Sequence, residues 1–150
     1  MDAVTYPNPD VIQFIQGHVV PVRLPFDAKP EADNFNVKWT PTLIILDHDG
    51  GEHHRTTGFL APEELLPMIL LGMGKTHLER EEFTEAITSL DTLLKDYPKS
   101  DSAPEAIYYG AVSRYKSTHK AQPLKEGYEK LQAEYPSSEW TKRAAPYRLL

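Results

Sequence analysis

The sequence predicts an α/β unit followed by an all-α unit, with the change near residue 66. Up to about residue 60, turn residues alternate with short apolar runs, and beyond it the apolar residues follow a helical period almost to the end. In addition, Leu93–Ser100 recurs as Leu131–Ser138, a spacing of 38 residues. A repeat of this length is typical of stacked helical hairpins.

Composition predicts a soluble protein. The 150 residues are 40% hydrophobic and 25% charged, no stretch approaches the roughly 18 apolar residues of a membrane span, and Met1–Val4 does not resemble a signal peptide. We therefore expect a cytoplasmic protein, or a periplasmic one if an upstream segment is missing. The net charge of −6, with basic residues scattered among acids, argues against nucleic acid as a partner.

The first predicted element is a helix that begins after Asn8. Asn8 is a suitable N-cap, Pro9 suits the first helical position, and apolar residues follow at helical spacing up to Gly17. The run Val19–Leu24 then predicts a strand. Because Pro21 cannot donate a ladder hydrogen bond, we expect this strand to be exposed along part of one edge.

A hairpin is predicted next, after a short helix within Pro30–Phe35. Thr42–Leu46 is apolar at both alternations, which predicts a strand covered on both faces. Asp47–Gly51 is a strong turn signal, and Glu52–Thr57 reads as the returning strand. Pro62 and the acidic residues after it predict the start of a helix.

Residues 67–150 resemble tetratricopeptide repeats. Gly74 and Ala86 lie 24 and 12 positions before Pro98, where that family has small packing residues, and large apolar positions of the pattern are filled by Phe83, Leu90 and Leu93. The second unit, around Tyr128, Leu131 and Pro136, fits more loosely. Trp140–Leu150 is expected to close the stack, with Trp140, Ala144 and Tyr147 facing it.

Residues 1–66 resemble the part of a thioredoxin-like domain that follows its Cys-x-x-Cys motif. Val37–Thr42 is similar to the loop that carries the family's cis proline, which would be Pro41 here. The hairpin and the segment Gly58–Leu65 follow in the family's order, and Met1–Tyr6 is similar to the helix that continues from the cysteine pair. The fold class is therefore an incomplete thioredoxin-like sheet of about three strands with flanking helices, followed by helical hairpin repeats.

The departure from the thioredoxin-like pattern is large, because the chain contains no cysteine. The segment that carries the family's cysteines and central strand has no counterpart in residues 1–66. The central strand would lie between Val19–Leu24 and Leu43–Leu46, and a gap there would leave backbone groups unpaired. Three alternatives stay open: the two flanking strands pair directly, another chain supplies a strand, or the sequence is part of a longer protein.

The candidate binding residues are Trp39, Thr40 and Pro41 in the first unit and Tyr108 and Tyr115 in the second. The resemblance implies that Thr40, just before the cis proline, could dock an extended peptide. The two tyrosines could line a concave repeat surface, since aromatic residues often anchor partners. We predict no catalytic residue in this chain.

Histidines and carboxylates gather around the hairpin turn, at His48, Asp49, His53 and His54. They are ordinary metal ligands, but His53 and His54 are adjacent and would point to opposite faces of a strand. We therefore expect a solvated turn, with no metal or cofactor.

The sequence favours a redox-inactive interaction or assembly module that binds a protein or peptide. A homo-oligomer through the open sheet edge is an additional expectation. The alternative is the C-terminal part of a thiol–disulfide oxidoreductase whose Cys-x-x-Cys lies upstream.

Overall fold

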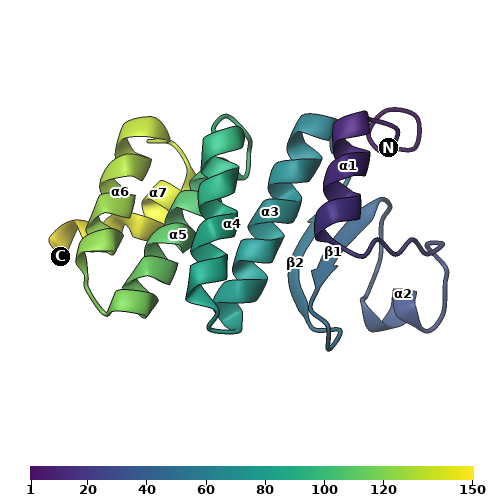
Figure 1. Ribbon diagram of the computed structural model, residues 1–150, viewed down its shortest axis with the longest axis horizontal. Coiled ribbons are helices and arrows are strands. Elements are labelled where there is room, and N and C mark those ends of the chain that lie inside the picture. Colours follow the sequence, from purple (N-terminus) through teal and green to yellow (C-terminus); the bar gives the residue numbers. More distant parts are fainter.

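The computed structural model describes all 150 residues and is mostly helical. Two strands and the helices around them form one end of an elongated molecule, and stacked helical hairpins form the other (Figure 1). The elements in chain order are α1 (Pro9–His18), α2 (Glu31–Asn34), β1 (Thr42–Leu46), β2 (Glu52–Thr57), α3 (Pro62–Glu79), α4 (Phe83–Asp96), α5 (Ala103–Thr118), α6 (Gln122–Glu134), α7 (Glu139–Ala144) and the 3₁₀ helix η1 (Ala145–Leu149).

Helix α1 begins where the sequence predicts. The Asn8 side chain accepts hydrogen bonds from the backbone N–H groups of Asp10 and Val11, at 2.9 and 3.2 Å, which satisfies two donors that have no partner within the helix. Val11 is buried in a cluster with α3 residues. Before α1, the segment expected to continue a helix forms hydrogen-bonded turns instead, in which Thr5 donates its N–H to Met1.

The sheet contains two strands, not the three that were expected. β1 and β2 pair as an antiparallel hairpin, with Thr42 opposite Thr57 and Ile44 opposite Arg55. The register is irregular between Ile45 and Leu46, where a β-bulge adds one residue to β2. β1 is only partly buried, so the prediction of a strand fully covered on both faces is wrong.

The segment Val19–Leu24 has no strand partner, so the prediction of a third strand is wrong, as is the alternative in which it pairs directly with β1. Val20 and Val22 are 90% and 76% exposed. A strand needs a neighbouring ladder for its backbone groups, and nothing in this chain provides one here. Pro21 and Pro25 also lack the N–H that pairing would use.

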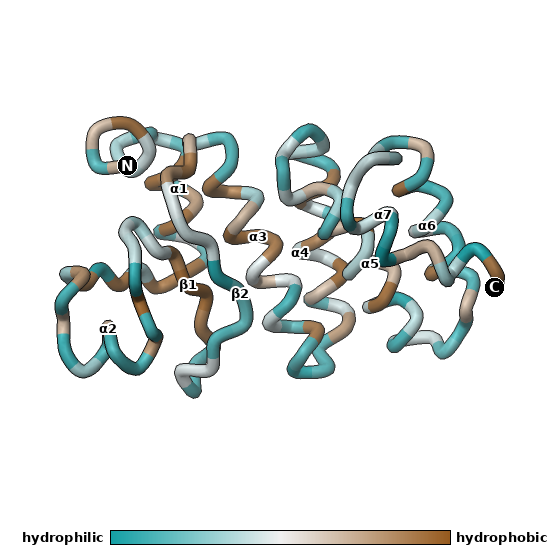
Figure 2. Tube along the Cα trace, turned by 180° about the vertical axis from the view of Figure 1, so that it is seen from behind, coloured by the Kyte–Doolittle hydropathy of each residue, from teal (hydrophilic) through white to brown (hydrophobic).

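Helix α3 connects the two halves of the molecule. Its first turns are buried against α1 and the hairpin. There, Leu43 and Ile45 of β1 pack against the core cluster that includes Val11, Leu65 and Ile69. Figure 2 shows apolar stretches along β1 and α3. The helix continues through Pro67 as one uninterrupted element, and its second half packs on α4.

Helices α3 to α6 pack in succession as hairpins, as the internal repeat predicts (Figure 1). Both copies of the repeated motif end a helix in the same way, because Tyr97 and Tyr135 are C-caps with φ of −130° and −136° and bond back to Leu93 and Leu131. The chain then closes with α7 and η1. Ala144 is buried, and Trp140 and Tyr147 pack against its cluster, as expected.

Candidate functional site

The loop before β1 carries three of the candidate binding residues together. The Thr40–Pro41 peptide bond is cis, as the resemblance implied. The Thr42 hydroxyl donates to the Trp39 carbonyl at 2.6 Å, which closes the loop on the start of β1. Trp39 is 69% exposed, so this large apolar side chain lies on the surface.

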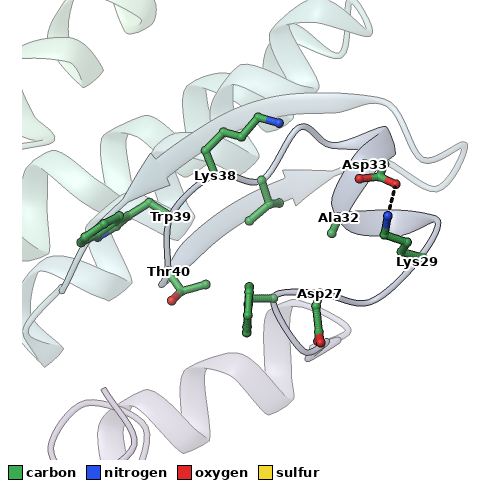
Figure 3. Close-up of a pocket in the computed structure, with 9 residues that line it drawn as sticks. Asp27, Lys29, Ala32, Asp33, Lys38, Trp39 and Thr40 are labelled. Carbon is green, nitrogen blue, oxygen red and sulfur yellow. Dashed lines mark ion pairs between the residues drawn. The ribbon is translucent and has the colours of Figure 1, made fainter.

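Beside this loop lies an open depression of about 480 Å³. Lys38, Trp39 and Thr40 lie on one side of it, and the segment from Asp27 through α2 forms the other (Figure 3). Phe26, which is 70% exposed, also lines it, and Lys29 and Asp33 pair with each other on its α2 side at 3.2 Å. The depression therefore combines exposed apolar side chains with groups of both charges.

The outer edge of β1 is open next to this depression. Gly58 donates its N–H to Pro41 at 2.8 Å, and the antiparallel alternation then directs the backbone groups of Leu43 and Ile45 toward β2. The N–H and C=O of Ile44 consequently point away from β2, where no further strand lies. An edge of this kind can accept an added strand.

The structure does not bring Tyr108 and Tyr115 together with the loop before β1. Tyr108 packs among aromatic residues near the chain end, stacked on Tyr147 with ring centroids 5.9 Å apart, and their hydroxyls lie 3.2 Å from each other. Burial and this contact raise the pKa of Tyr147 to about 12. Tyr115 is partly exposed and borders a separate depression of about 370 Å³ with Phe83.

The hairpin turn holds a side-chain cluster that sequence reasoning missed. The expectation of a solvated turn is wrong for Asp47 and His53, whose side chains are each only 11% exposed. His53 Nε2 lies 3.0 Å from Asp47 Oδ2, and His53 Nδ1 lies 2.5 Å from Glu79 Oε2 at the end of α3. These hydrogen bonds, with Asp47 first, raise the pKa of His53, and the contact with His53 is the main cause that lowers the pKa of Asp47.

The adjacent His53 and His54 were expected on opposite faces of the strand, yet both contact α3. His54 Nδ1 lies 3.3 Å from Lys75 Nζ, one helical turn before Glu79. The bulge in β2 explains the difference, because an extra residue interrupts the alternation of side chains. Burial, with a smaller contribution from Lys75, lowers the pKa of His54 to about 4. The pKa values of the two neighbouring histidines are therefore shifted in opposite directions, and His54 loses its proton at a lower pH than His53 does.

Comparison with known families agrees with the fold. The thioredoxin-like domain family matches residues 1–71, and the tetratricopeptide repeat family matches residues 69–100. Neither the curated proteins nor the solved structures contain a significant match. None of the helices combines the length and apolar character that crossing a membrane requires. The chain thus contains a thioredoxin-like domain over residues 1–71, without any cysteine, followed by a tetratricopeptide repeat over residues 69–100.

Proposed function

We propose that the protein is a redox-inactive interaction module that binds an extended segment of a partner protein at the open edge of β1. The observation that carries the proposal is the combination of an unpaired strand edge with a depression beside it that is lined by the exposed apolar side chains of Phe26 and Trp39. An extended segment would pair with the outward backbone groups of Ile44 and cover these side chains.

The neighbouring surface supports this proposal. Residues 20–27 are all exposed, and the apolar residues Val20, Val22 and Leu24 among them have no strand partner, so this segment could pair with the far side of an added strand. Thr40 and Trp39 would contact the same segment at one end. In this proposal residues 1–66 form the binding unit and residues 67–150 form a helical unit that supports it and offers a second protein-binding surface, in which Tyr108 and Tyr115 are candidates.

The test begins with a displayed library of random short peptides, selected on the full chain. We expect enriched sequences with apolar residues at alternate positions. Calorimetry with one enriched peptide should then show at least about tenfold weaker binding, or about 1.4 kcal/mol, for Val22→Asp and for Trp39→Ala. Both positions are exposed, so circular dichroism should show unchanged folding.

Leu149→Asp is the matched control. Leu149 is 80% exposed but lies in η1, at the opposite end of the molecule from β1 (Figure 1). Its substitution should leave peptide affinity unchanged. Failure to enrich any peptide, or an equal loss of affinity in the control, would contradict the proposal. Light scattering without peptide distinguishes a second copy as the occupant, since self-association would then depend on concentration and weaken in Val22→Asp.

A second candidate function is the C-terminal part of a thiol–disulfide oxidoreductase. The thioredoxin-like match over residues 1–71 favours it. Sequencing the DNA before the Met1 codon tests it directly: an in-frame Cys-x-x-Cys would support this candidate, and an in-frame stop codon would exclude it. The chain of 150 residues should not reduce insulin in either case, because it has no thiol.

A further inference from the structure

His53 occupies a position in which both ring nitrogens face carboxylates. Asp47 comes from the hairpin turn and Glu79 from the last residue of α3, and the nitrogen–oxygen distances are 3.0 and 2.5 Å. His53 lies at the bulge of β2, which directs its side chain toward α3. The imidazole therefore bridges two elements that are far apart in the sequence.

This geometry requires a doubly protonated ring. An ionised carboxylate only accepts hydrogen bonds, whereas a neutral imidazole has one N–H and can satisfy only one of the two carboxylates. The imidazolium has two N–H groups and satisfies both. Deprotonation would leave one nitrogen lone pair facing a carboxylate oxygen, which is repulsive.

The surrounding charges favour the cation. Asp47 and Glu79 contact the ring directly, and the cation Arg80 lies beside Asp47, with Nη1 3.5 Å from both Asp47 Oδ2 and Asp49 Oδ2. Arg80 in turn pairs with Glu82, which also binds His77 at 2.6 Å. On β2 itself, Arg55 is paired with Glu52.

A second feature shows that the contact can act on the turn. Asp47 Oδ1 accepts the backbone N–H groups of Asp49 and Gly51, at 3.0 and 2.8 Å, and so holds the turn in its conformation. Its other oxygen is bound to His53. One carboxylate thus couples the shape of the turn to the protonation of the histidine.

We propose that His53 is a proton-dependent latch. In its charged form it fixes the tip of the β1–β2 hairpin to the C-terminal end of α3, just before the turn that leads into α4. Loss of the proton releases the tip while the base of the hairpin stays packed on the core. The latch sets how firmly the thioredoxin-like part is held on the first helical hairpin.

The direction of the pH effect follows from the raised pKa of His53. Below the usual value of 6.5, the histidine is charged in both folded and unfolded chains, and the stabilisation is complete. Above 6.5 the unfolded chain releases its proton first. The stabilisation therefore falls as the pH rises and is lost once the pH passes the pKa in the folded protein.

NMR titration of the histidine ring resonances in the full chain tests the proposal. The midpoint of His53 should lie above that of His48, which is on the same turn but 70% exposed. Glu79→Gln keeps the shape of its side chain and removes a charge, so it should lower the His53 midpoint. Hydrogen exchange of the β2 amides, corrected for intrinsic rates, should accelerate severalfold above the His53 midpoint.

Each variant has a defined outcome. His53→Gln should remove the pH-dependent step in exchange, and His48→Gln should leave it intact. A His53 midpoint at or below that of His48 would overturn the proposal, as would a raised midpoint without any change in exchange. If His53→Gln does not fold, Glu79→Gln decides: an unshifted midpoint and an unshifted exchange step would refute the latch.

Discussion

Replacing Gly74 by alanine tests the packing of the first helical hairpin. A Cβ atom at this position would lie 2.6 Å from both Cγ and Cδ2 of Leu90. Carbon atoms pack best at about 3.5–4.0 Å, so the leucine or the whole of α4 would have to move by about 1 Å. Leu90 is fully buried among Leu70, Leu71 and Leu93, which leaves it little room to move.

The expected free energy combines two opposing effects. Alanine in place of glycine within a helix gains about 1 kcal/mol from the backbone. Overpacking a well-filled core costs about 1–3 kcal/mol. Because the new contact is with a buried branch carbon of Leu90, we expect the upper part of that range. The Gly74→Ala variant should then be less stable than the wild type by about 1–2 kcal/mol.

Gly17→Ala is the matched control. Gly17 also lies in a helix, α1, but a Cβ there would meet no atom within 4 Å. This variant should gain up to about 1 kcal/mol from the backbone effect alone. Urea denaturation followed by circular dichroism gives the free energy of unfolding for both variants and for the wild type.

A double-mutant cycle with Leu90→Ala isolates the contact. Truncation of Leu90 should itself cost about 2–5 kcal/mol, but it removes the atoms that the new Cβ strikes. In that background Gly74→Ala should become stabilising. If Gly74→Ala stabilises the wild type as much as Gly17→Ala does, or if the two substitutions in the cycle are additive, the reasoning about close packing is refuted.

Three further predictions concern single side chains. Thr5 is fully buried and its hydroxyl donates to the Leu60 carbonyl at 2.6 Å, so Thr5→Val should lower the free energy of unfolding by about 1 kcal/mol. Thr5→Ser keeps the hydroxyl and should lower this free energy less. Equal losses for the two variants in urea denaturation would argue against the hydrogen bond. Tyr108→Phe should lower the pKa of Tyr147 from about 12 but leave it above 10, because burial remains; an unchanged titration of the Tyr147 ring resonances would contradict this. Burial lowers the pKa of His54 to about 4, so between that pH and about 6.5 the unfolded chain binds more protons than the folded chain, and the free energy of unfolding should rise with pH. In His54→Gln the free energy of unfolding should depend less steeply on pH over this range.

Local sequence patterns were sufficient for most elements. The Asn8 cap, the turn signal at Asp47–Gly51 and the period of 38 residues act through neighbours along the chain or through helical spacing, and each predicted an element that the structure contains. The small residue at Gly74 is a similar case, because its packing role depends on one neighbouring helix. Here the fold follows from short-range rules that a sequence displays directly.

Tertiary structure decided the rest, for two physical reasons. Val19–Leu24 has the composition of a strand, but a strand exists only where another backbone pairs with it, and this chain supplies none. His53 and His54 were assigned to opposite faces by strict alternation, which a single extra residue at the bulge disrupts. The bulge brings His53 into contact with Glu79, which lies 26 residues further along the chain, and a pattern of neighbouring residues cannot predict a contact over that separation. The sequence by itself therefore determined which segments are helices and hairpins, whereas the tertiary structure decided which edge stays unpaired and which histidine carries the charge.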